Sequence, residues 1–207
     1  MLHTAHGYWI TEAGPPAALP ALDRELKADV VIVGGGFTGM WTAWHLSRTE
    51  PGLRIALLES DLMGHGPSGR NGGFADAMWV SFARLAERHG VEAAIEIGRA
   101  SEESVTQIGE FCEEQGVDAW FRRAGYLNVS TAPAQDGAWL ENTQAMSAAG
   151  VGEDFEILDA AALAGICVSP RFRGGVKYSA AATVQPARLA FGIRRAPSCA
   201  GAVETLR

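Results

Sequence analysis

The feature that most constrains the fold is the run Gly34-Gly35-Gly36-Phe37-Thr38-Gly39, which stands between an apolar β-branched segment and a helical one. The segment Asp29–Val33 has an unbroken β-branched apolar run over Val30–Val33 and predicts a central strand of a parallel sheet. Thr38–Arg48 predicts a helix, and Arg54–Glu59 predicts a second strand. A strand, a glycine-rich turn, a helix and a second strand within about 30 residues are typical of a βαβ unit in an α/β protein.

Each glycine of this run has a separate physical task in a G-x-G-x-x-G turn. Gly34 allows the tight turn out of the strand, Gly36 lets the backbone approach a pyrophosphate, and Gly39 lets the helix pack closely on the strand. The helix then directs free N–H groups and its positive dipole end at the phosphates. The alternative is a glycine-rich turn that binds no ligand.

An acidic residue follows at the expected distance. Glu59 ends the second strand about 20 residues after the motif, where a carboxylate accepts hydrogen bonds from the ribose of a dinucleotide. The alternative for Glu59 is a solvated strand end. Its negative charge would repel a 2′-phosphate, so NADP is disfavoured.

A second group of glycines follows Glu59. The chain contains 25 glycines among 207 residues, and five of them cluster at Gly64, Gly66, Gly69, Gly72 and Gly73. Successive N–H groups in such a loop form a concave site for an anion. Arg70 either adds a positive charge near a phosphate or forms a surface salt bridge. Asn71 is a candidate cap for a helix that would follow it.

Three segments together are similar to one known family. The segments Ala28–Gly36 and Ser68–Phe74, with Glu59 between them, resemble the FAD-dependent amine oxidases of the glycine/D-amino-acid oxidase family. Tyr8-Trp9 and the Ser68–Gly73 loop look most like its gamma-glutamylputrescine oxidoreductase branch. The resemblance implies an α/β protein with a Rossmann-like, FAD-binding parallel sheet, here incomplete, and part of an α+β substrate domain.

The resemblance also implies a role for individual residues. Backbone groups of Phe37 and Thr38 would contact the pyrophosphate, Glu59 the ribose, and Ser68 a phosphate or the ribitol. Asn71 occupies the position at which some relatives attach the flavin through histidine, so no covalent link is expected there. The full set of expected cofactor-binding residues is Gly34, Gly36, Phe37, Thr38, Gly39, Glu59, Ser60, Ser68, Arg70, Asn71, Gly72, Gly73 and Phe74.

In this family an amine is oxidised to an imine by hydride transfer to the flavin, and the imine is then hydrolysed. The resemblance therefore implies a small amine or amino acid as substrate and an electron acceptor such as oxygen. No catalytic residue can be named; Tyr126 and Tyr178 are either substrate-pocket residues or ordinary strand aromatics. An NAD-dependent dehydrogenase and a non-catalytic remnant remain alternatives, and the second glycine cluster favours FAD over NAD.

Composition excludes several other classes. The formal charge of −7 disfavours nucleic acid as a partner. Cys112, Cys167 and Cys199 form no C-x-x-C pair, and the histidines lack metal-ligand spacing, so neither a disulfide framework nor a metal site is expected. No apolar run reaches the length of about 18 residues needed to span a membrane, and the N-terminus lacks a secretory signal. These features predict a cytoplasmic protein.

The predicted organisation has four parts. Residues 1–28 form a lead-in interrupted by Pro15, Pro16 and Pro20; 29–118 form the FAD-binding part with a helical insertion; 119–180 belong to the substrate domain; and 181–207 return to the FAD-binding part. A helix should begin at Pro186 and be interrupted at Pro197. Full members of the family are much longer, and a third parallel strand begins only at Val203. An N-terminal fragment is therefore expected.

Overall fold

A computed structural model describes residues 7–17, 19, 21–196 and 203–206. The proline at 20, the predicted helix break at Pro197 and Cys199 lie outside the described residues. The chain divides into two compact units. Unit 1 comprises Met1–Gly73, Phe111–Phe121 and Val184–Arg207, and unit 2 comprises Phe74–Glu110 and Arg122–Thr183. Residues 74–110, which lie within the predicted FAD-binding part 29–118, group with unit 2.

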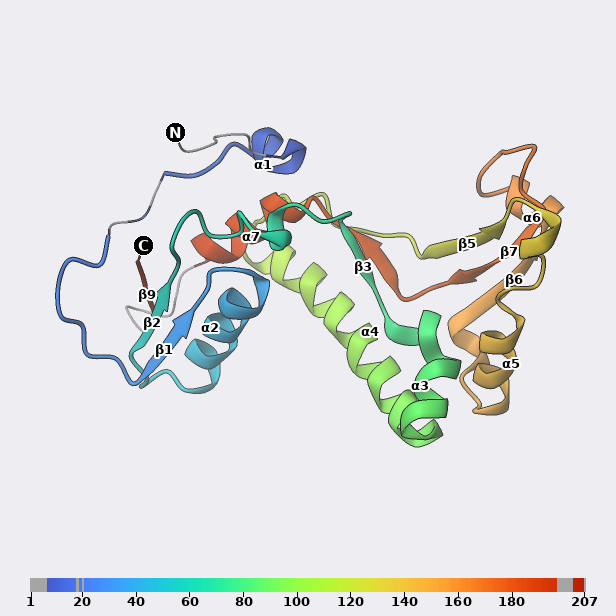
Figure 1. Ribbon diagram of the computed structural model, residues 1–207, viewed down its shortest axis with the longest axis horizontal. Coiled ribbons are helices and arrows are strands. Elements are labelled where there is room, and N and C mark those ends of the chain that lie inside the picture. Colours follow the sequence, from blue (N-terminus) through green and yellow to red (C-terminus); the bar gives the residue numbers. More distant parts are fainter. Residues whose placement is uncertain (1–6, 18, 20, 197–202, 207) are drawn as a thin grey trace. The chain divides into compact units, whose positions relative to one another are not determined.

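Unit 1 contains the predicted parallel sheet (Figure 1). Its strands lie in the order β1-β2-β9, and Ile55 of β2 pairs in parallel with Val30 on one side and Val203 on the other. Its elements are α1 (Tyr8–Ala13), β1 (Val30–Val33), α2 (Phe37–Thr49), β2 (Ile55–Leu58), η1 (Pro67–Gly69), α7 (Pro186–Arg195) and β9 (Val203–Leu206). The α/β fold with a third parallel strand from Val203 is confirmed.

The position of β1 in the sheet differs from the prediction. β1 was expected to be a central strand, but it forms an edge of the described sheet and pairs only with β2. Val31 and Val33 are 58% and 82% exposed, whereas Ile32 lies next to Gly39 of α2. A four-residue apolar run is compatible with either position, because hydrophobicity alone does not specify how many neighbours a strand has.

Unit 2 contains two antiparallel sheets of three strands, in the orders β3-β8-β4 and β5-β7-β6. Its strands are β3 (Phe74–Asp76), β4 (Arg122–Arg123), β5 (Tyr126–Ser130), β6 (Phe155–Asp159), β7 (Gly174–Tyr178) and β8 (Ala181–Thr183). Its helices are η2 (Met78–Ser81), α3 (Phe82–His89), α4 (Val91–Glu114), η3 (Pro133–Gln135), α5 (Leu140–Ala148), η4 (Gly152–Asp154) and α6 (Ala160–Ala164), and α4 ends with four residues that belong to unit 1.

Local signals account for the starts of the two helices α6 and α7. Asp159 caps α6 by accepting a hydrogen bond from the N–H of Ala162, and Pro186 stands at the start of α7, where a helix was predicted to begin. Residues 133–149 do not form one continuous helix but are divided into η3 and α5. Gly137 lies between them with a φ of +77°, a conformation that no helix accepts.

The core of unit 2 forms around Trp79, which is fully buried. The ring of Trp79 occupies the space that a Cβ on Gly98 of α4 would need, so this glycine allows the close approach. Tyr178 belongs to the same core and stacks on Tyr126 of the neighbouring strand, and its hydroxyl accepts a hydrogen bond from Asn142 at 2.9 Å. Of the two readings for Tyr178, the structure supports the strand aromatic.

Candidate cofactor site

The first glycine loop has the geometry that its sequence requires. Gly34 leaves β1 with a φ of +107°, and its N–H donates to the carbonyl of Leu58 at 2.8 Å. A Cβ on Gly39 would overlap the carbonyl oxygen of Gly34, so only glycine allows α2 to begin so close to the strand. The loop therefore brings the start of α2 to the carboxyl end of β1.

The N-terminus of α2 offers donors at this point. Gly36 is the N-cap residue and supplies no side-chain acceptor, and within the described part of the chain no acceptor is found for the N–H groups of Thr38 and Gly39. The N–H of Phe37 donates to the Ser68 hydroxyl at 2.9 Å. Two of the first three N–H groups of α2 are thus available to an anion.

Glu59 is directed at the glycine loop from the end of β2. Its Oε2 accepts a hydrogen bond from the N–H of Gly35 at 2.8 Å. Its Oε1 accepts from the Ser60 hydroxyl and from the N–H of Asp61, each at 3.1 Å. Because each carboxylate oxygen has two lone pairs, these bonds leave capacity to accept from the hydroxyls of a ribose. Ser60 serves to orient Glu59.

The second glycine loop, residues 61–73, folds against the first. The N–H of Gly64 donates to the carbonyl of Gly35 at 2.8 Å, and Ser68 approaches Phe37 as described. A Cβ on Gly36 would lie 3.1 Å from the Ser68 Oγ, and one on Gly35 would overlap the buried side chain of Met63. Met63 could not be identified as part of the site from the sequence, because a lone methionine in a loop carries no signal of its own.

Asn71 and Gly73 shape the end of this loop. The Asn71 Oδ1 accepts from the N–H of Gly73 at 2.7 Å, and its Nδ2 donates to the Ser68 carbonyl at 2.9 Å. The strand β3 follows, so the prediction that Asn71 caps a helix is wrong; Asn71 instead forms a local turn. Gly73 has a φ of +74°, and a Cβ there would overlap the Val184 carbonyl oxygen.

The other predicted residues of this segment are less constrained. Arg70 is exposed and donates from Nε to the Gly66 carbonyl at 3.4 Å, and it has no carboxylate partner among the described residues. The surface salt bridge considered for Arg70 is therefore not formed. Gly72 is exposed, and Phe74 begins β3 in unit 2 with 67% of its surface exposed.

The reactive side chains do not form a catalytic group of their own. Burial raises the pKa of the Cys112 thiol to about 11, which makes it a poor nucleophile. Cys167 is exposed and free, and His65 pairs with Asp61 at 3.0 Å. Among residues 7–17, 19, 21–196 and 203–206, no three His, Cys, Asp or Glu side chains form a metal site, and no helix there could cross a membrane.

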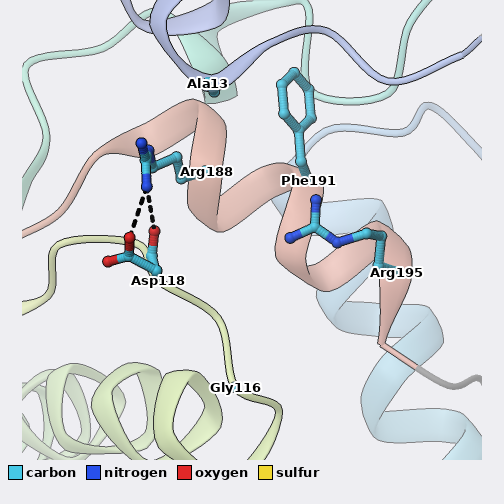
Figure 2. A pocket seen from close by; sticks show the side chains of 6 residues that line it. All are labelled: Ala13, Gly116, Asp118, Arg188, Phe191 and Arg195. Atoms are coloured by element: carbon cyan, nitrogen blue, oxygen red, sulfur yellow. Dashed lines mark hydrogen bonds and ion pairs between the residues drawn. The ribbon is translucent and has the colours of Figure 1, made fainter.

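Unit 1 also contains a separate pocket of about 270 Å³ (Figure 2). Its lining residues are Ala13, Gly116, Asp118, Arg188, Phe191 and Arg195. Arg188 donates to the Asp118 carboxylate at 2.7 Å on one wall. None of the residues expected to bind the cofactor lines this pocket, so it is distinct from the paired glycine loops.

The fold and the loop pair define a dinucleotide-binding α/β protein. Residues 29–204 match the family model described as FAD dependent oxidoreductase (DAO), and the chain belongs to this family. The predicted family membership and the assignment of FAD as its cofactor are thus confirmed. This match favours an FAD-dependent oxidoreductase over the alternative of an NAD-dependent dehydrogenase.

The chain is similar in sequence to one curated protein and in fold to two solved structures. The chain is 29% identical over 194 residues to gamma-glutamylputrescine oxidoreductase of Escherichia coli, covering 92% of this chain and 44% of that protein. Glycine oxidase from Geobacillus kaustophilus has the same fold, with a TM-score of 0.65 at 20% identity over 87% of this chain and 46% of that one. L-amino acid deaminase from Proteus myxofaciens gives 0.67 at 19% identity, covering 93% and 39%. The chain thus spans less than half the length of these relatives.

Proposed function

We propose that this chain supplies the FAD-binding loops of an oxidoreductase that acts on a small primary or secondary amine or amino acid. The C–H bond next to the amine nitrogen breaks, the nitrogen lone pair forms an imine, and hydrolysis gives a carbonyl compound and ammonia or a smaller amine. Bound FAD would accept the hydride, and an acceptor such as oxygen would remove the electrons. The cytoplasm, where thiols stay reduced, suits the free Cys112 and Cys167.

The observation that carries this proposal is the convergence of three groups on one turn. The N–H groups at the start of α2, the Ser68 hydroxyl and the Glu59 carboxylate all meet the Gly34–Gly39 loop. Donors at a helix N-terminus suit a pyrophosphate, and a carboxylate at the end of the next strand suits a ribose. The residues present therefore fit the adenosine diphosphate part of FAD.

Each of these residues has a distinct task in the proposed site. Thr38 and Gly39 donate their N–H groups to pyrophosphate oxygens. The Ser68 oxygen accepts from Phe37, so its own proton can be donated to a phosphate oxygen. Glu59, oriented by Gly35 and Ser60, accepts from the ribose hydroxyls. Gly72, Gly73 and Phe74 lie on the segment expected to approach the flavin, and Arg70 would add positive charge near the phosphates.

Flavin binding by the purified chain tests this proposal. FAD added to the parent should lose fluorescence as it binds, and Gly36→Val should abolish the loss because its side chain enters the space beside Ser68. Gly52→Val is the matched control, since a Cβ on Gly52 meets nothing within 4 Å. Equal FAD affinity in the parent and in Gly36→Val would refute the site. Flavin binding without turnover of any amine would favour the non-catalytic alternative.

A carboxylate variant separates the ribose contact from the pyrophosphate contact. Glu59→Ala should weaken FAD binding by about 10- to 100-fold, the effect of losing hydrogen bonds to a charged group. The same variant should affect binding of free pyrophosphate much less. Glu114→Ala, which removes an exposed carboxylate at the end of α4, serves as the control for net charge.

A further inference from the structure

The short helix α1 is held in place by tertiary contacts. Six residues are too few for a stable isolated helix, so α1 depends on its neighbours. Ile10 is fully buried, although residues on either side of it reach solvent. The contacts that fix α1 are therefore specific, and they come from two other parts of unit 1.

The first of these contacts is a polar network with α7. Gln185, the N-cap residue of α7, is fully buried; its Nε2 donates to the Trp9 carbonyl at 2.8 Å and to Glu12 Oε2 at 2.7 Å. Its Oε1 accepts from the N–H of Arg188 at 2.8 Å. All hydrogen-bonding groups of this amide are thus used, and the network costs no unsatisfied polar atom.

Glu12 completes the network with a bidentate ion pair to Arg188. Arg188 donates from Nη2 to Glu12 Oε1 at 2.8 Å and from Nε to Oε2 at 3.1 Å. The Arg188 guanidinium also reaches the Asp118 carboxylate at 2.7 Å (Figure 2). It lies 4.7 Å from the centre of the Trp120 ring. The hydrogen bonds from Arg188 and Gln185 lower the pKa of Glu12, so the carboxylate stays charged.

The second set of contacts joins α1 to the loop that carries Ser68. A Cβ on Gly69 would lie 3.5 Å from the Ile10 side chain, and one on Gly7 would lie 3.5 Å from the Arg70 side chain. The other helix of the network contacts the same loop, because a Cβ on Gly64 would lie 2.7 Å from Ala190 of α7. The loop that places Ser68 against Phe37 thus contacts both α1 and α7.

We propose that α1 positions the second glycine loop for its ligand, and that Glu12 is the positioning residue that locks α1 to α7. This inference rests on the proposed function, because the ligand in question is the pyrophosphate of FAD. Glu12 itself does not touch the site; it acts through Ile10, Gly69 and the backbone that carries Ser68. The lead-in that precedes the first strand therefore contributes to cofactor binding.

Amide hydrogen exchange on the flavin-free 207-residue chain tests the positioning step directly. Glu12→Ala should speed exchange of peptides covering 64–73 by at least about tenfold, the factor that corresponds to 1.4 kcal/mol, while peptides of β1 and β2 keep the parent rate. Glu114→Ala should match the parent throughout. Unchanged exchange at 64–73 in Glu12→Ala, with faster exchange confined to α1, would overturn the proposal.

If Glu12→Ala increases exchange throughout unit 1, the milder variant Glu12→Gln still tests the positioning role. Glu12→Gln keeps the shape and one acceptor oxygen but loses the charge, so faster exchange should be confined to α1 and residues 64–73. Uniform acceleration across unit 1 in Glu12→Gln would mean that Glu12 stabilises the unit generally. That outcome also contradicts a positioning role.

The affinity for FAD tests whether the position of residues 64–73 affects ligand binding. The dissociation constant, measured by quenching of flavin fluorescence, should rise about tenfold in Glu12→Ala and stay at the parent value in Glu114→Ala. A looser loop with unchanged affinity would refute the positioning role but not the cofactor site. If the parent itself bound no FAD, the proposed function would fail, and the proposal that rests on it would fail with it.

Discussion

The paired glycine loops of unit 1 and the Trp79 core of unit 2 are held together by different interactions. In unit 1, two glycine loops, a buried amide and ion pairs join segments that are far apart in the sequence. In unit 2, a cluster of buried apolar side chains around Trp79 lies between helices and an antiparallel sheet. The edge strand β1 exposes Val31 and Val33, whereas the central strand β7 buries every residue except Lys177, which is half-buried.

The difference shows where specificity and stability are concentrated. Burial of apolar surface stabilises a fold without regard to direction, so unit 2 depends mainly on volume and packing. Hydrogen bonds and close backbone contacts depend on precise geometry, so the paired glycine loops depend on single atoms, such as the missing Cβ of Gly39. Substitutions that remove volume or add one atom distinguish the two units.

The largest effect is expected from Trp79→Ala in unit 2. Removing a fully buried indole should lower the free energy of unfolding by about 3–5 kcal/mol. Urea unfolding, followed by hydrogen exchange of peptides from each unit, measures the loss and locates it. Trp120→Ala is the matched control in unit 1, where the ring is 47% exposed and contacts Arg188. An equal loss in both variants would contradict the contrast between the units.

Gly39→Ala tests the close approach of α2 to β1 in unit 1. The added Cβ would overlap the Gly34 carbonyl oxygen, and the required backbone shift should cost about 1–3 kcal/mol. The thermal midpoint of unfolding reports this change. Gly52→Ala adds the same atom in open space of the same unit and should change the midpoint little. Equal midpoints for the two variants would show that α2 does not need its close approach to β1.

Acid should weaken unit 2 through Asp136. The Arg173 guanidinium and the Ser130 hydroxyl lower the pKa of Asp136 to about 2. A group with a lowered pKa stabilises the fold above its unfolded pKa of about 3.9, and this stabilisation is lost as the pH falls to about 2. Asp136→Asn should therefore flatten the fall in the urea midpoint between these pH values. A fall as steep as in the parent would exclude Asp136 as its source.

The smallest effect, with the opposite sign, is expected at Asp154. Burial raises the pKa of this carboxyl, partly offset by Arg99 at 3.4 Å, and its Oδ2 is buried without a partner within the part of the chain that the structure describes. Because burial favours the neutral carboxyl, Asp154 contributes its stabilisation below the pKa that it has in the unfolded chain. That contribution is lost as the pH rises through the raised pKa of the folded protein. Asp154→Asn should thus slightly raise the urea midpoint at pH 7 and leave it unchanged at acid pH. A lower midpoint at pH 7 would contradict this.

The local parts of the fold were predictable from the sequence. The order of strand, glycine turn, helix, strand and acid predicted β1, α2, β2 and the position of Glu59, because each signal spans only a few residues. The roles assigned to the thirteen expected cofactor-binding residues stay predictions. The structure brings Glu59, Ser60 and Ser68 to the first loop, while Arg70 and Gly72 remain at the surface.

The sequence by itself determined the βαβ turn and its glycines, since backbone conformation at Gly34 and close approach at Gly39 leave no other residue type suitable. Only the tertiary structure decided that Ser68 meets Phe37 and that Gln185 joins α7 to α1. These contacts join residues from 31 to 176 positions apart. No periodicity or local motif reports such pairs, because they form only when separate segments pack together.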